Sequence, residues 1–228
     1  MTQNINSRIS IQVSLSGYSF KVYDRNGLVS SSDWNGAGSV FTNSEFQNRY
    51  DKVDISVFTP KCTLVPSQFF NPSSGRFVLA DVCQLKENDV INFVEVPQFN
   101  SVLVYSQTTG EILSSTIANT VLCSDGNKGS VYPETFYLLD EFMKIDEYNK
   151  IIASYYDGHL YLVIGQGKTL LLCNTFEAVD FTTAQYFIFL ALKKLQLNPE
   201  VSSIYFRTPL GQEEEMSLYR YFKAVERI

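Results

Sequence analysis

A short hairpin pattern occurs twice in this chain and constrains its fold more than any other feature. Residues 15–22 are LSGYSFKV, and residues 156–163 are YDGHLYLV. Both segments place an apolar and then a polar residue before a glycine, and both continue in an alternation that ends on valine. Alternation with a period of two is typical of a strand with one buried face, and glycine is favoured in tight turns. The chain therefore contains two strand–turn–strand segments built on one pattern.

Further elements follow each hairpin in the same order. Alternation over 8–34 predicts a meander of three strands, and residues 151–176 predict a second meander with turns at 157–158 and 165–167. The first meander is followed by a helical stretch near Glu45 and a strand. The second is followed by a long helix and a strand; these later elements are expected at 53–58, 180–197 and 203–206. A duplicated β-β-β-α-β plan explains this order best, and chance similarity between two hairpins is the alternative.

The duplication predicts a first half over residues 1–145, with insertions, and a second half over residues 146–228. The long helix of the second half is apolar nearly all round, so we expect it to be covered on most sides. A helix that opens at Glu213, and then a closing strand or the end of that helix, complete the second half. In the middle of the chain we expect helices at 66–70, 80–86, 108–118 and 132–143, strands at 90–96 and 101–105, and a loop at 126–129.

Charge and composition argue against several classes of partner. The formal net charge is −6 and the lysines and arginines form no cluster, which disfavours nucleic acid and anionic membrane. The longest apolar run, residues 186–192, is far shorter than the roughly 20 residues of a membrane span. The first eight residues are polar and do not resemble a signal peptide. We therefore expect no membrane span and a cytoplasmic location.

The four cysteines support the same location. Their spacing contains no C-x-x-C pair, so a zinc site is not expected. Cys173 lies in an apolar segment that is typical of a buried strand. We expect free thiols of the core type at all four positions, Cys62, Cys83, Cys123 and Cys173.

Two sequence signals suggest chemistry but have simpler structural explanations. Gly167-Lys168-Thr169 matches the end of a P-loop, yet the first glycine of that motif would fall on Leu162, and residues 170–176 look like a strand where a P-loop requires a helix. The segment is predicted to be a hairpin turn. His159 is the only histidine and has no recognisable catalytic partner, so a surface histidine is expected. The first strand carries no aspartate for a two-metal nuclease site.

The order of elements, found twice in one chain, resembles the actin-like ATPase fold, in which two ribonuclease H-like halves face each other across a cleft. Residues 11–20, 63–66 and 170–176 resemble, more narrowly, a bacterial family of uncharacterised proteins with that fold. The resemblance covers nearly the whole chain. It implies an α/β fold with two ribonuclease H-like halves, each a three-stranded antiparallel meander followed by alternating helices and strands.

The resemblance also implies where a nucleotide would bind. In actin-like ATPases and sugar kinases, the glycine turn of each meander approaches the phosphates, and an aspartate two residues before it handles magnesium or its waters. A further glycine-containing loop contacts the adenosine. The corresponding turns in this chain give the candidate cofactor-binding residues Ser16, Gly17, Asp157, Gly158 and Gly211.

The two aspartate positions are occupied by Leu15 and Tyr156, which weakens the prediction of ATP hydrolysis. Strand alternation would direct the neighbouring polar residues to the opposite face. We therefore expect no cofactor and no catalytic residues, and we expect a binding or scaffold module that holds a protein or peptide partner. The alternative is a nucleotide-dependent enzyme, an ATPase or small-molecule kinase, that uses Mg-ATP and relocated carboxylates at Asp24, Asp157 and Asp180. The sequence does not predict an oligomeric state.

Overall fold

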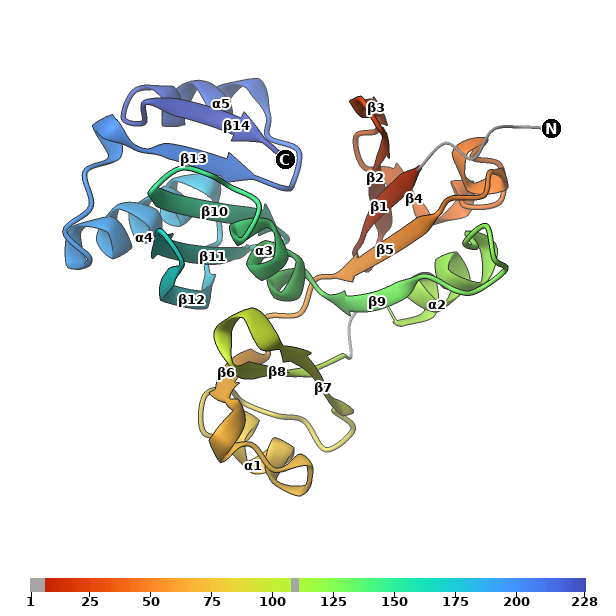
Figure 1. Ribbon diagram of the computed structural model, residues 1–228, viewed down its shortest axis with the longest axis horizontal. Coiled ribbons are helices and arrows are strands. Elements are labelled where there is room, and N and C mark those ends of the chain that lie inside the picture. Colours follow the sequence, from red (N-terminus) through yellow and green to blue (C-terminus); the bar gives the residue numbers. More distant parts are fainter. Residues whose placement is uncertain (1–6, 108–110) are drawn as a thin grey trace. The chain divides into compact units, whose positions relative to one another are not determined.

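The computed structural model describes residues 7–107 and 111–228 (Figure 1). Contacts between residues divide the chain into two compact units. The first unit combines residues 1–59 with residues 107–133, and the second combines residues 60–106 with residues 134–228. Both units are therefore assembled from segments that are distant in sequence.

The sheet of the first unit is built on the first meander. Three antiparallel strands are followed by two strands that run parallel to the first, in the order β3-β2-β1-β5-β9. A short further strand, β4, pairs with β2 off this path. The strands are β1 (Arg8–Val13), β2 (Gly17–Asp24), β3 (Gly27–Ser31), β4 (Asn35–Gly36), β5 (Lys52–Val57) and β9 (Ser130–Pro133).

Alternate residues of this sheet form the core of the first unit. Ile11 lies opposite Phe20 on one side and Ile55 on the other, and Ile11 and Ile55 are fully buried. Ile117 of helix α2 (Glu111–Thr120) packs into the same cluster. The helical stretch predicted near Glu45 is a single 3-10 turn, η2 (Glu45–Gln47), and a second such turn, η1, covers Ala37–Ser39. Residues 108–110 of the predicted helix at 108–118 lie outside the described residues.

The sheet of the second unit repeats the strand order of the first. Its meander is followed by two parallel strands, giving β12-β11-β10-β13-β14. In both sheets the third strand of the meander is an edge strand, and the first lies beside the parallel pair. The strands are β10 (Asn149–Tyr156), β11 (His159–Gln166), β12 (Thr169–Glu177), β13 (Ser203–Phe206) and β14 (Ala224–Arg227).

Helices cover both faces of this second sheet. Helix α3 (Glu134–Phe142) packs against β10 and β11 (Figure 1). The opposite face, which includes Ile151 and Leu162, packs against α4 (Phe181–Lys194) and α5 (Gln212–Tyr219). A 3-10 turn, η6 (Pro199–Val201), joins α4 to β13.

Residues 60–106 form a small sheet of their own within the second unit. Its three strands are antiparallel in the order β6-β8-β7, and Leu79 of helix α1 packs against Val104 in its core. These elements are β6 (Cys62–Pro66), α1 (Gly75–Ala80), β7 (Ile91–Val96) and β8 (Ser101–Ser106), with 3-10 turns η3 (Ser67–Phe69), η4 (Pro72–Ser74) and η5 (Pro97–Phe99).

The predicted halves, 1–145 and 146–228, follow the repeated elements, whereas the compact units follow packing. Helix α3 belongs to the second unit by its contacts although it precedes the second meander in sequence. The two criteria therefore divide the chain at different residues, and the boundary at 145/146 stays a prediction.

Some predicted elements in the middle of the chain are wrong. The helix expected at 80–86 is irregular, because helical structure begins earlier, where the Asn71 side chain accepts a hydrogen bond from the backbone N–H of Ser73 and Pro72 follows. The helix expected at 132–143 begins two residues later, because residues 130–133 pair with β5. Strand β6 was not predicted.

Helix α4 is covered on most sides, as its sequence predicts, and is exposed at Tyr186. Its buried residues lie toward the sheet, while Tyr186 is 60% exposed. Within the apolar run 186–192 only Tyr186 is exposed, so the expectation that most sides of the helix are covered is confirmed. The helix also ends at Lys194 and not at Leu197, because Gln196 adopts a left-handed backbone with φ of 56°.

Candidate functional site

The first predicted glycine turn connects β1 to β2 and is closed by its own hydrogen bonds. The backbone N–H of Ser14 donates to the carbonyl of Gly17 at 2.9 Å. The N–H of Gly17 donates to the Ser14 hydroxyl oxygen at 3.1 Å, and that hydroxyl donates back to the Gly17 carbonyl at 3.0 Å. Leu15, 65% exposed, and Ser16 form the tip of the turn. The Gly17 amide is therefore already engaged within the turn.

Gly17 is required here by a close approach between strands. A Cβ atom at this position would lie 2.1 Å from the backbone oxygen of Asn35, because β4 pairs with β2 at this point. The glycine lets two backbones meet inside the first unit. Its presence in the sequence is explained by packing, without any bound phosphate.

The second glycine turn connects β10 to β11 in two residues. Asp157 and Gly158 have φ values of 47° and 70°, the left-handed pair that a tight hairpin turn requires. Asp157 is exposed, and its carbonyl accepts a hydrogen bond from Nδ1 of His159 at 2.8 Å. This hydrogen bond therefore stabilises the turn. The partner of His159 in it is a backbone carbonyl, which has no catalytic role.

The third predicted position, Gly211, is the residue that precedes helix α5. Its backbone N–H donates to Oε2 of Glu214 at 2.8 Å, so a carboxylate of the same helix already occupies this amide. Gly211 has an extended backbone with φ of −66°. The helix N-terminus here is therefore satisfied internally by Glu214.

Within the second unit the structure brings Gly158 and Gly211 to the end of the sheet where the parallel strands β10 and β13 terminate. Strands β10 and β13 are parallel neighbours, and the N–H of Tyr155 donates to the Thr208 hydroxyl at 3.0 Å, which joins the ends of the two strands. Gly17 and Ser16 belong to the first unit, at the end of β1. The five predicted residues thus all follow the carboxyl end of a strand, and three of them, Asp157, Gly158 and Gly211, lie at the same end of the second sheet.

Several acidic groups lie near this end of the sheet. The pKa of Tyr155 is raised by burial and by the negative charges of Asp180, Glu214 and Asp157. Asp180 is engaged as the N-cap of α4, where Oδ1 accepts the N–H of Thr183 at 2.7 Å. In residues 7–107 and 111–228, no three His, Cys, Asp or Glu side chains are grouped as a metal site requires. Asp157, Asp180 and Glu214 therefore give this end of the second sheet a negative charge.

The third relocated carboxylate, Asp24, lies far from the glycine turn that it was expected to support. It is the last residue of β2, whereas Gly17 is the first. Seven residues of extended strand separate the two positions by roughly 23 Å. The Asp24 carboxylate instead accepts the N–H of Asn26 at 2.7 Å in the next turn. The prediction that Asp24 lies near Gly17 is wrong.

A buried polar cluster in the second unit was not predicted. Glu134, the first residue of α3, is fully buried and accepts a hydrogen bond from the Ser154 hydroxyl at 2.6 Å. Its other oxygen lies 2.5 Å from Nη1 of Arg207, which follows β13. The Arg207 guanidinium lies over the Tyr137 ring at 5.1 Å. This cluster joins α3 to two strands of the sheet.

The charges of this cluster stabilise each other. Burial lowers the pKa of Arg207, but the negative charges of Glu134 and Glu141 and the hydrogen bond to Glu134 together outweigh burial, so the pKa is raised. Because the described partners occupy both carboxylate oxygens, Glu134 is suited to position α3 and not to transfer protons. The available sequence signal was a glutamate directly after Pro133 at the start of an apolar helix, but its partner, 73 residues away, could be found only in the structure.

The cysteines are free, but they are less buried than predicted. All four are half-buried. The Cys62 sulfur lies 3.4 Å from the Thr135 hydroxyl and 3.8 Å from that of Thr175, and burial raises its pKa. Burial also raises the pKa of Cys173. These two thiols are therefore poor nucleophiles at neutral pH.

A comparison with known families identifies the chain. The sequence model described as "Protein of unknown function (DUF3822)" matches residues 1–225. The chain belongs to the DUF3822 family. No curated protein matches this DUF3822 sequence.

Several solved structures are similar to this DUF3822 protein. A Bacteroides thetaiotaomicron protein, described as having an actin-like ATPase fold and unknown function, matches with a TM-score of 0.69 and 18% identity, over 100% of this chain and 94% of that one. The PilM-PilN type IV pilus biogenesis complex matches with a TM-score of 0.50 and 12% identity, over 97% and 88%. An exopolyphosphatase from Cytophaga hutchinsonii has a TM-score of 0.41, at 10% identity over 94% and 71%.

The predicted fold and family are therefore confirmed. The DUF3822 chain is a mixed α/β protein with the actin-like ATPase fold, and its function is unknown. At these levels of identity the similarity concerns the fold alone. None of the helices in the described part of the chain is both long enough and apolar enough to traverse a bilayer.

Proposed function

We propose that this DUF3822 protein is a non-hydrolysing binding or scaffold module that acts through a protein or peptide partner. The proposal rests on one observation: the backbone N–H groups of two glycines are already hydrogen-bonded within the protein. The Gly17 N–H is bonded to Ser14, and the Gly211 N–H is bonded to Glu214. A phosphate-binding turn needs such amides to point at the ligand.

Charge supports the same proposal. A nucleotide triphosphate bound near Gly158 would approach Asp157, Asp180 and Glu214, the three acidic groups that raise the pKa of Tyr155. Without a cation held between them, like charges repel. The positions from which a magnesium-binding aspartate is expected are occupied by Leu15 and Tyr156. The donors present therefore fit Mg-ATP poorly.

The fold is compatible with a binding role. The solved PilM-PilN structure, which is similar in fold, is described as a complex. That description concerns those proteins, and its use here is an analogy between folds. It supports the class of function proposed and not the identity of a partner.

Thermal unfolding of the full chain with Mg-ATP, Mg-ADP and Mg-GTP tests the proposal. We expect no change in melting temperature with any of them. A ligand at 100 times its Kd would add about 2.7 kcal/mol, an easily measured shift. An upward shift would contradict the proposal and support the nucleotide-dependent enzyme. In that case Asp157→Ala should abolish the shift, with Asp125→Ala as the control at another exposed turn.

The partner is tested separately. The tagged full chain, produced in its native cells and crosslinked before lysis, should recover the same protein in independent replicates. The control bait is the Glu134→Ala variant, in which we expect the folded state to be less stable. Recovery of no specific protein by the folded bait, or equal recovery by both baits, would contradict the proposal.

A further inference from the structure

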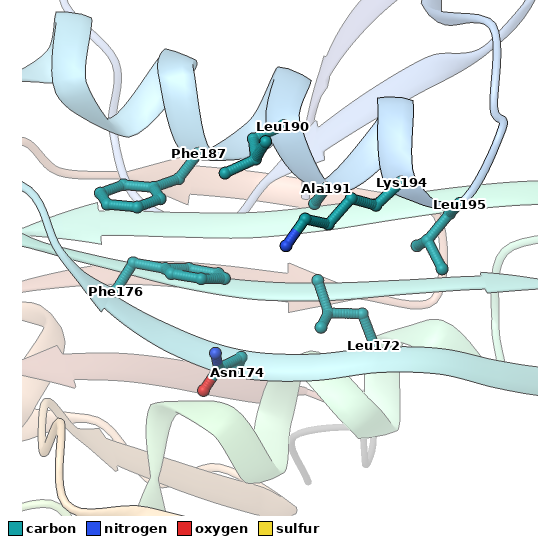
Figure 2. A pocket seen from close by; sticks show the side chains of 8 residues that line it. All are labelled: Leu172, Asn174, Phe176, Phe187, Leu190, Ala191, Lys194 and Leu195. Atoms are coloured by element: carbon teal, nitrogen blue, oxygen red, sulfur yellow. The ribbon is translucent and has the colours of Figure 1, made fainter.

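An apolar groove lies between β12 and α4 in the second unit. Figure 2 shows Leu172 and Phe176 on the strand facing Phe187 and Leu190 on the helix. The rings of Phe176 and Phe187 stack with a centroid distance of 4.8 Å and close one part of the groove. Leu172, Phe176 and Phe187 are only half-buried, at the margin of the core of this unit. The groove is therefore an opening into the edge of that core.

The groove lies on one face of β12, and the contact with β6 lies on the other. Strand β6 meets β12 at Cys62, whose sulfur is 3.8 Å from the hydroxyl oxygen of Thr175. Successive side chains of a strand point to opposite faces of the sheet, so Thr175 points away from the groove that Asn174 and Phe176 line. In the described part of the chain, the lining residues come from β12, α4 and the residue that follows α4. Strand β6 therefore leaves the groove accessible.

The size and lining of the groove fit a small molecule. Its volume is about 270 Å³, and small-molecule sites typically measure roughly 300–1,000 Å³. Such sites are lined mainly by apolar side chains, with a few polar groups that orient the ligand. Six of the eight residues that line this groove are apolar, and the other two are Asn174 and Lys194. The space therefore suits a slender apolar ligand with one polar end.

The two polar residues come from opposite walls. Asn174 lies in the middle of β12, and Lys194 is the last residue of α4. Side chains on a helix lean toward its N-terminus, and Figure 2 shows the Lys194 amine extending across the groove. Over residues 7–107 and 111–228, Lys194 forms no ion pair. The groove thus offers an ammonium group without a carboxylate partner, together with an amide that can donate a hydrogen bond.

We propose that this groove binds a medium-chain fatty acid, with its carboxylate on Lys194 and Asn174 and its alkyl chain against the leucine and phenylalanine side chains. A hydrogen bond between an ammonium and a carboxylate is stronger than one between neutral groups. One cation lines the groove, so a single negative charge matches it, whereas a phosphate ester would bring a second charge without a partner. The inference concerns a different surface from the glycine turns and does not depend on the proposed function.

Calorimetric titration of the full chain with sodium decanoate, below the concentration at which decanoate forms micelles, gives the first test. We expect saturable binding of one molecule per chain. A series from hexanoate to decanoate should bind progressively more tightly, by up to about fourfold for each methylene group that the groove buries. Decanol, which has the same chain and no charge, should bind about tenfold more weakly than decanoate.

Two neighbouring lysines provide a matched pair of variants. Lys194→Gln removes the charge that lines the groove, and we expect it to weaken decanoate binding about tenfold or more while leaving decanol binding unchanged. Lys193→Gln removes the same charge from the same turn of α4. Lys193 does not line the groove, so this control should bind decanoate like the wild type.

A third variant tests the place of the alkyl chain. Leu190→Trp fills the groove with a larger side chain and should abolish the binding of both decanoate and decanol. Tyr186→Trp is its control, because Tyr186 is 60% exposed and is not among the residues that line the groove. Circular dichroism verifies that both variants fold. If Leu190→Trp does not fold, the two lysine variants decide the question.

Four results would overturn the proposal. The first is a wild-type chain that shows no saturable binding of decanoate up to about 1 mM. The second is binding of many decanoate molecules per chain, which is the behaviour of a detergent. The third is equal affinity of Lys194→Gln and Lys193→Gln, and the fourth is unchanged binding by a folded Leu190→Trp variant. Either of the last two would place the ligand outside this groove.

Discussion

Glu134 and Arg207 depend on each other because both charges are removed from water. The two residues are 0% and 5% exposed. Removing one partner of such a pair leaves the other charge buried, at a cost of about 3–5 kcal/mol. We expect Glu134→Leu and Arg207→Leu each to lower the free energy of unfolding by that amount, and the double variant to lose less than the sum.

Urea unfolding of the four proteins measures this coupling. Lys144→Ala is the control, because its ion pairs with Asp140 and Glu141 lie near the surface of the same helix and should contribute less than about 1 kcal/mol. Additive losses in the double variant would show that Glu134 and Arg207 do not stabilise each other.

Gly17 is the second residue whose replacement has a clear expected cost. Gly17→Ala would place a methyl group 2.1 Å from the Asn35 backbone oxygen, and β4 would have to move. We expect a loss of about 1–3 kcal/mol in the free energy of unfolding. Gly38→Ala is the matched control, because nothing lies within 4 Å of its new methyl group. Equal stability of the two variants would contradict the close approach described.

At the scale of elements, Asp180 fixes the start of α4. Its pKa is lowered mainly by the backbone N–H of Thr183, so the charged carboxylate stabilises the folded state. That contribution is complete above the unfolded pKa of about 3.9 and is lost as the pH falls through the lower pKa of the folded state.

We therefore expect Asp180→Ala to lower the melting temperature at pH 7, and Asp180→Asn, which keeps the capping oxygen, to lower it less. The difference between wild type and Asp180→Asn should shrink as the pH falls below about 4. Melting temperatures of the three proteins between pH 3 and pH 7 measure this. A difference that grows toward low pH would contradict the assigned direction.

At the scale of the whole molecule, residues 60–106 behave as an insertion. Cys62 pairs with Tyr105, and the N–H of Ser106 donates to the carbonyl of Lys61, so both ends of the segment lie side by side. Replacing the segment by a short Gly-Ser linker should leave the first unit folded. Helix α3 should exchange amide hydrogens faster, because Phe142 loses its contact with Phe99.

Hydrogen exchange of the shortened chain, followed by mass spectrometry, measures both effects. Slow exchange retained in β1 and β5, together with faster exchange in α3, is the expected pattern. Loss of protection in β1 would show that the inserted segment is needed for the first unit to fold.

The sequence alone determined the meanders, because strand alternation and glycine turns act between neighbouring residues. The three-strand segments at 8–34 and 151–176 were predicted in order, as were the helix after Asp180 and the turn at Lys168. The closing element at 222–228 was left open between strand and helix, and it is a strand, β14. The fold was predicted because the repeated order of elements resembles the actin-like ATPase fold, and the family was predicted from the resemblance of residues 11–20, 63–66 and 170–176.

The tertiary structure decided everything that depends on distant residues. Strand β9 exists because β5 lies beside it, and Glu134 can be buried only because Arg207 reaches it from 73 residues away. The same applies to the glycine turns: the sequence placed Gly17 in a turn, but only the fold shows that Asn35 explains the glycine. Local patterns record the geometry of adjacent residues, whereas burial, pairing and charge compensation arise from contacts that no local pattern contains.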